Sequence, residues 1–203
     1  MRARVKRMLP RRLVSMARDC AGLPLGVILT YVRLRTARLV GARRDDTKLI
    51  ARPASLLFVC YGNIMRSPFA AELARARLDE SGQRFAISSA GTGAANARPA
   101  DPRAIAAAAR HGISLRAHRS LQITPELVDR SDLVCVMDYR NEAEVVARFP
   151  RASGRTMLLG GAVLTTREPE IPDPYPLEDD AVAEVFERLS LAVDALVSRL
   201  ASG

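Results

Sequence analysis

A chain of 203 residues is long enough for one ordinary domain with an extension, and its composition, 48% hydrophobic and 26% charged, is typical of a globular protein. Three cysteines, Cys20, Cys60 and Cys135, provide no disulfide framework, and no Cys/His spacing fits a zinc site. The net charge of +9 comes from one end, because residues 1–55 contain 14 Lys and Arg against 3 Asp and Glu, whereas residues 56–203 contain 17 against 19.

Residues 1–54 form a basic extension that we expect to be partly helical. Its apolar run, 23–32, contains Pro24 and Gly26 and is too short to span a membrane. A secretory signal is disfavoured because no convincing small-residue cleavage site follows. Two interpretations stay open: a solvated, partly helical arm, either folded onto the domain or upstream of the true start codon, or a basic amphipathic segment on an anionic membrane surface. Nucleic-acid binding is disfavoured, because Tyr31 is the only aromatic residue here.

The most informative stretch begins with a short apolar segment of strand type, 55–59, and ends with an alanine- and leucine-rich segment, 69–78, that suits a helix. Between them we expect a tight loop, with Ser67 as the helix N-cap and Pro68 as the first helical residue. Backbone N–H groups in such a loop converge, and the helix N-terminus adds free donors. The stretch therefore predicts a pocket for a phosphate-like dianion. The residues expected to line it are Tyr61, Gly62, Asn63, Ile64, Met65, Arg66 and Ser67.

Cys60 opens this loop and Arg66 closes it, an arrangement that suits attack of sulfur on phosphorus. Donors that bind a phosphate also stabilise a thiolate, which is a strong nucleophile. The planar guanidinium of Arg66 can bind two phosphoryl oxygens at once. A cysteine at the end of a strand is usually only a small buried residue. The prediction of a catalytic site therefore depends on the whole sequence from 60 to 68 and not on Cys60 and Arg66 alone.

Downstream of this stretch, short apolar strands alternate with helices. In chain order we expect a strand at 84–92, a helix at 99–110, a helix that starts at 124, a strand at 133–137 followed by a helix to about 148, a short strand at 156–159 and a final helix at 178–202. This alternation predicts an α/β fold with a parallel sheet covered on both faces. Ligands bind such sheets beyond the carboxyl ends of the strands, which is where the Cys60 loop lies.

The string at 60–68, Cys-x-Gly-Asn-x-x-Arg-Ser-Pro between a strand and a helix, resembles the active-site loop of the low-molecular-weight protein tyrosine phosphatases. The resemblance extends over about 55–200. It implies a three-layer domain at 55–203 with a four-stranded parallel sheet, flavodoxin-like and of the phosphotyrosine phosphatase I type. It also implies hydrolysis of phosphotyrosine or aryl phosphate esters through a cysteinyl-phosphate, without a metal or other cofactor. Many members carry a second cysteine before the arginine, where this chain has Met65.

The resemblance implies a general acid late in the chain. From the residues alone, the proline-rich segment 171–176 is most simply a turn. Asp173, followed by a proline and an aromatic residue, matches the Asp-Pro-aromatic motif of the family, and its carboxyl would protonate the leaving group. The family often has a tryptophan at the pocket wall, but this chain contains none, which implies a more open pocket. The residues that would form its walls are Tyr61, Ile64 and Tyr175.

The resemblance also implies a hydrogen-bond network that holds the loop in shape. Its members would be Asn63, Ser67, Ser89 and His118. Without the resemblance, His118 would be interpreted as a surface or capping residue. Asp138 follows the strand at 133–137, and we interpret it as a helix cap and not as a catalyst, while Cys135 is expected in the core.

Two other functions stay open from the sequence. An arsenate reductase of related fold would use the same loop as a redox relay, but it would need further cysteines to resolve the adduct. A noncatalytic adaptor that binds phosphate would not need Cys60, Arg66 and Asp173 together. As a phosphatase, the protein is expected to be bacterial and cytoplasmic, peripheral at the inner membrane face, with a phosphotyrosine protein as substrate. A tyrosine kinase of polysaccharide export is the partner that the resemblance implies.

Overall fold

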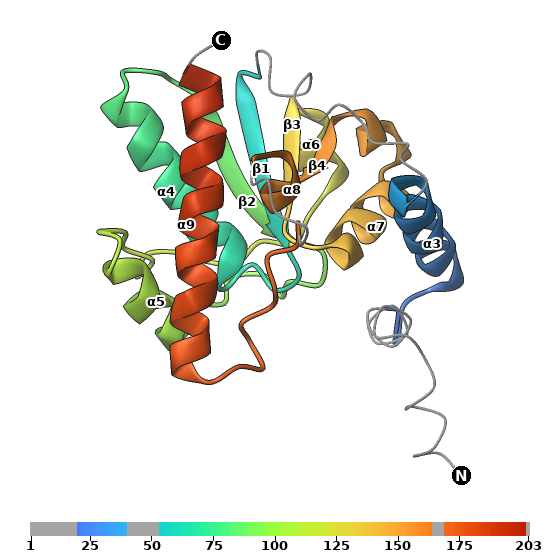
Figure 1. The fold of residues 1–203 in the computed structure, drawn as a ribbon, viewed down its shortest axis with the longest axis horizontal. Helices are drawn as coiled ribbons and strands as arrows, with labels where there is room; N and C mark the ends of the chain where they lie inside the picture. The colour runs from blue at the N-terminus through green and yellow to red at the C-terminus, as the bar shows by residue number, and fades with distance from the viewer. Residues whose placement is uncertain (1–19, 40–52, 164–168, 202–203) are drawn as a thin grey trace.

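Four parallel strands in the order β2–β1–β3–β4 form a sheet with helices on both faces (Figure 1). The strands are β1 (Ser55–Cys60), β2 (Ala86–Gly91), β3 (Leu133–Val136) and β4 (Thr156–Leu158). The computed structural model describes residues 20–39, 53–163 and 169–201. The predicted α/β fold with a four-stranded parallel sheet is confirmed.

The helices follow the predicted order closely. They are α3 (Leu25–Leu39), α4 (Arg66–Glu80), α5 (Pro102–Ala109), α6 (Pro125–Asp129), α7 (Tyr139–Arg148), α8 (Leu159–Val163) and α9 (Asp179–Ala201), with a 3-10 helix at Pro150–Arg155. The side chains of Asp101 and Thr124 cap α5 and α6, because each accepts a hydrogen bond from an amide of the first turn. The short α8 and the 3-10 helix lack a clear apolar periodicity and were not predicted.

The prediction that Ser67 is the N-cap of the first domain helix is wrong. Helix α4 begins at Arg66, and Met65 takes the N-cap position without a side-chain hydrogen bond. The Ser67 hydroxyl lies inside the first turn and contacts the Cys60 sulfur, the side-chain nitrogen of Asn63 in the preceding loop and the backbone oxygen of Ala90 on β2. A capping serine would have satisfied an amide of the first turn, so this hydroxyl serves the loop and not the helix end.

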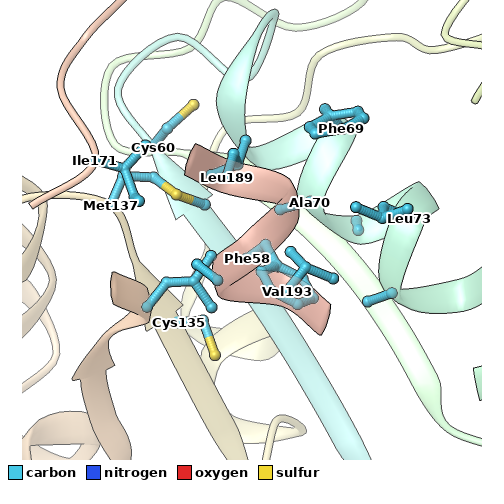
Figure 2. Packing of buried hydrophobic residues seen from close by; sticks show 14 of the residues in the cluster. Phe58, Cys60, Phe69, Ala70, Leu73, Cys135, Met137, Ile171, Leu189 and Val193 are labelled. Atoms are coloured by element: carbon cyan, nitrogen blue, oxygen red, sulfur yellow. The ribbon is translucent and has the colours of Figure 1, made fainter. Parts of the chain in front are cut away.

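The central strand β1 is buried on both faces, as expected for a parallel strand between two helical layers. Its side chains alternate: Phe58 packs with Phe69 and Leu73 of α4 and with residues of α9, and Val59 packs on the α7 side. Figure 2 shows part of the first of these clusters, with the Cys60 sulfur at its upper edge and the buried Cys135 at its lower edge.

Helix α3 of the extension packs against α7, at the side of the sheet opposite α4 and α9 (Figure 1). Val27 and Tyr31 are buried in the cluster on that side, whereas Leu25 and Leu29 are exposed. The described part of the extension is therefore a helix docked on the domain; 1–19 and 40–52 lie outside the described residues. Across the described ranges, no helix combines the length and the hydropathy needed to cross a bilayer.

The sheet order brings the ends of three strands together at one edge. Cys60, the last residue of β1, pairs in register with Gly91, the last residue of β2, and β1 pairs on its other side with β3, which ends at Val136. Because the strands are parallel, the loops that follow all three leave from this edge. The segments after Cys60, Gly91 and Val136 therefore meet, and they carry the residues described next.

Candidate active site

The loop after β1 curls around the sulfur of Cys60. The backbone N–H of Asn63 donates to Sγ at 3.2 Å, and the hydroxyl oxygen of Ser67 lies 3.0 Å from Sγ. Both contacts come from residues that are themselves buried. These two contacts hold the sulfur in one position inside the loop, an arrangement that suits a sulfur nucleophile.

Asn63 is the residue that fixes the shape of this loop. Its backbone is left-handed, with φ of 51°, a conformation that asparagine tolerates better than most residues. Its side-chain nitrogen donates to the hydroxyls of Ser67 and Ser89, at 2.9 Å each, and its side-chain oxygen accepts from the backbone N–H of Leu121 at 2.8 Å. One fully buried amide thus joins the loop to α4, to β2 and to the segment before α6.

Two further contacts support the loop from outside. His118 Nε2 lies 2.7 Å from the backbone oxygen of Asn63, and the Ser67 hydroxyl oxygen lies 3.2 Å from the backbone oxygen of Ala90. Gly91 is required by close packing, since a Cβ there would lie 2.4 Å from the backbone oxygen of Tyr61. The structure thus brings together all four residues of the expected network.

The guanidinium of Arg66 points inward and is almost fully buried. Its Nη1 donates to Asp138 at 2.7 Å and to the backbone oxygen of Ile171 at 3.0 Å, and its Nη2 lies 3.1 Å from Asp173 Oδ1. Burial tends to lower the pKa of Arg66, but the facing carboxylates of Asp138 and Asp173 outweigh burial and raise that pKa above its ordinary value. Arg66 is therefore a fixed cation, held in one orientation.

Asp173 lies on the loop before α9 and contacts the same arginine. Its side chain is 47% exposed, in contrast to the 2% of Arg66, so the carboxyl also reaches solvent. The loop is fixed at its base, because the buried Ile171 donates its N–H to the backbone oxygen of Met137 at 2.8 Å. The structure therefore brings Asp173, Arg66 and the Cys60 loop to one place.

Two half-exposed tyrosines flank the loop. Tyr61 lies under the guanidinium of Arg140, 5.4 Å from its ring centroid, and packs so closely on Gly93 that a Cβ there would lie 2.5 Å from the ring. The ring centroid of Tyr175 lies 5.8 Å from the guanidinium carbon of Arg103. The same guanidinium donates a hydrogen bond to the backbone oxygen of Tyr175 at 3.1 Å.

Of the three expected wall residues, Ile64 differs from the two tyrosines. Ile64 is only 7% exposed and belongs to the main core cluster, as does the neighbouring Met65. The exposed aromatic surface beside the loop is therefore supplied by Tyr61 and Tyr175, while Ile64 packs beneath.

Asp138 has a second role that the sequence did not indicate. It caps α7 as expected, since its side chain accepts from the backbone N–H of Asn141 at 2.7 Å. The same carboxylate also pairs with Arg66. The signal available in the sequence was its position directly after a buried strand, but only the strand order shows that β3 lies beside β1. Arg103 and Arg140, beside the tyrosines, were likewise missed.

The comparisons with known proteins agree with this geometry. The family model described as low molecular weight phosphotyrosine protein phosphatase matches residues 55–203. A relative named probable low molecular weight protein-tyrosine-phosphatase EpsP, from Ralstonia nicotianae, is 39% identical over 146 residues, which is 72% of this chain and 95% of EpsP.

Two solved structures extend the comparison. The tyrosine phosphatase Wzb from Escherichia coli K30, in complex with sulphate, is 36% identical with a TM-score of 0.67, over 73% of this chain and 99% of that one. The YwlE arginine phosphatase from Geobacillus stearothermophilus is 31% identical with a TM-score of 0.66, over 74% and 94% of the two chains. The extension before residue 55 lies outside the family match.

The geometry of Asn63 predicts a graded loss of stability. Asn63→Ala should lower the free energy of unfolding by about 3 kcal/mol, because it removes buried hydrogen bonds and replaces asparagine, which tolerates a left-handed backbone, with alanine, which tolerates it less well. Asn63→Gly loses the same hydrogen bonds but tolerates the backbone, so it should lose about 1 kcal/mol less. Denaturant unfolding measures both; equal losses would contradict the backbone part of this explanation.

Proposed function

Because the chain belongs to the low molecular weight phosphotyrosine protein phosphatase family and is a protein-tyrosine phosphatase, we propose that Cys60, Arg66 and Asp173 carry out its two-step hydrolysis. The observation that supports this assignment most is the position of Arg66. Arg66 lies at the end of the loop that begins at Cys60, as the first residue of α4. Its guanidinium contacts Asp173 at 3.1 Å. A nucleophile, an anion-binding group and a proton donor thus share one site.

In the proposed first step, the Cys60 thiolate attacks phosphorus in line with the ester oxygen. The S–P bond forms while the P–O bond to the tyrosine breaks, and Asp173 in its acid form gives its proton to the departing phenolate oxygen. Arg66 and the loop N–H groups bind the other phosphoryl oxygens, where negative charge is greatest in the transition state.

In the second step, the Asp173 carboxylate accepts a proton from water as that water attacks the phosphocysteine. The S–P bond breaks, and phosphate and the thiolate are released. The Ser67 hydroxyl, 3.0 Å from the sulfur, stabilises the departing thiolate by hydrogen bonding. A redox relay is disfavoured, because Cys135 is fully buried within β3 and is paired in register with Phe58.

The aromatic surface beside the loop supports a planar substrate. Tyr61 and Tyr175, 46% and 54% exposed, can stack on the ring of a phosphotyrosine as it enters. A guanidinium substrate, as the name of the YwlE neighbour suggests for that protein, would meet the cations Arg103 and Arg140 on the same surface. We propose a phosphotyrosine protein as substrate, with a bacterial tyrosine kinase of polysaccharide export as the protein that the family resemblance favours.

We also propose that the extension holds this phosphatase on an anionic membrane surface at the cytoplasmic face. Leu25, Leu29 and Val32, at i, i+4 and i+7, form an exposed apolar stripe on α3, with exposed fractions of 71%, 62% and 40%. The exposed Arg33 lies beside it, and residues 1–55 carry 14 basic against 3 acidic residues. Apolar burial together with attraction to anionic lipid is the chemistry of interfacial helices.

Kinetics on aryl phosphates test the catalytic assignment. Cys60→Ser should abolish turnover while the protein still binds inorganic phosphate. Asp173→Asn should lower kcat/KM on phenyl phosphate by about 10²- to 10³-fold and on 4-nitrophenyl phosphate by less, because the better leaving group needs the proton less. Phosphoserine and phosphoarginine serve as comparison substrates. Wild-type rates in the Cys60→Ser protein would exclude covalent catalysis by this sulfur.

Vesicle sedimentation tests the membrane proposal in the full-length protein. The wild type should sediment with vesicles that contain phosphatidylglycerol and stay in solution with pure phosphatidylcholine. The double change Leu25→Asp and Leu29→Asp should weaken that binding about fivefold or more. The control is Leu191→Asp, which alters an equally exposed leucine, 61% accessible, on α9. Equal recovery of the wild type in both supernatants would end the proposal.

A further inference from the structure

A chain of contacts connects helix α3 to the active site through the first turn of α7. Its inner side is anchored by Val27 and Tyr31, which are buried, and one turn further on Arg35 lies over the ring of Tyr139, with its guanidinium carbon 4.1 Å from the ring centroid. Arg38 approaches the same ring at 5.3 Å and pairs with the buried Glu142 at 2.7 Å. These contacts fix Arg35 beside the start of α7.

Glu170 joins this corner to the loop that carries Asp173. Its Oε2 lies 3.7 Å from Arg35 Nη1, and its Oε1 accepts from the backbone N–H of Tyr139, the first residue of α7, at 3.0 Å. The carboxylate therefore sits between a cation of the extension and the positive end of a helix in the domain. Both neighbours hold the carboxylate in this orientation.

The next residue along the chain contacts the catalytic arginine. Ile171 donates its N–H to the Met137 oxygen at 2.8 Å, and its own oxygen accepts from Arg66 at 3.0 Å. Only Pro172, whose ring restricts the backbone, separates Ile171 from Asp173. A displacement of Glu170 would thus be passed directly to the carboxyl that faces Arg66.

We propose that Arg35 is a positioning residue for catalysis: it holds Glu170 on the Tyr139 amide and so fixes the loop that presents Asp173. This inference rests on the proposed role of Asp173 as general acid. It assigns the extension, which lies outside the family match, a part in the reaction itself. The ion pair is half-exposed, with side chains 17% and 35% accessible, so the effect on rate is modest and depends on salt.

The test compares Arg35→Gln with Arg151→Gln, which changes an exposed arginine of the 3-10 helix, in the full-length protein. Arg35→Gln should lower kcat/KM on phenyl phosphate about three- to tenfold and on 4-nitrophenyl phosphate by less, while the Kd for inorganic phosphate stays within about twofold. Glu170→Gln, which keeps an oxygen for the Tyr139 amide, should cause a similar loss. Arg151→Gln should leave all three quantities unchanged.

A double variant separates positioning from a purely structural effect. If Arg35 acts through Asp173, then adding Arg35→Gln to Asp173→Asn should cause no further loss, because the acid is already absent. Three results would overturn the inference while the proposed mechanism stands. They are losses of kcat/KM that multiply in the double variant, an equal loss of kcat/KM on both esters in Arg35→Gln, and no loss at all in Arg35→Gln. A failure of the mechanism itself would appear differently, as an Asp173→Asn protein with wild-type kcat/KM.

Discussion

The hydrogen bond from the Asn63 side chain to the Ser67 hydroxyl, 2.9 Å long, is the contact on which the site depends. Ser67 in turn contacts the Cys60 sulfur, so the amide sets the position of a hydroxyl of α4 that touches this sulfur. The same amide reaches Ser89 on β2 and the backbone of Leu121. A loop that would otherwise be mobile is thereby tied to three rigid parts of the domain, which is the condition for a preorganised anion site.

Arg66 connects the Cys60 loop to the two other segments of the site, at Asp138 and Asp173. Because its guanidinium is buried and already faces two carboxylates, its position fixes both the start of α7 at Asp138 and the loop of Asp173. A buried cation without such partners would be costly, and the two acids balance it. The Cys60 loop and the loop of Asp173 are therefore one electrostatic unit, although Arg66 and Asp173 lie 107 positions apart in the sequence.

Much of this arrangement could be predicted from the sequence, because local patterns determine it. The strand before Cys60 and strand β3 are short continuous apolar runs, the helix after Cys60 is rich in alanine and leucine, and the order of elements predicts the parallel sheet. The second role of Asp138 could not be predicted, since it depends on β3 lying beside β1. Ser67 was misplaced as a cap because serine at a helix start has two uses that the sequence does not distinguish.

The sequence left the docking of α3 on the domain open and did not indicate which side of the helix would pack. Its apolar residues lie all around the helix, with Tyr31 buried and Leu29 exposed, so no single stripe indicates which side packs.

The central claim, that the Cys60 sulfur takes the phosphoryl group, is tested most directly by mixing the protein with 4-nitrophenyl phosphate, denaturing it rapidly and locating the phosphate by mass spectrometry. We expect phosphate on Cys60, approaching about one group per chain, together with a burst of 4-nitrophenol. Phosphate on another residue, or a chain that turns over substrate without ever carrying phosphate, would contradict the account.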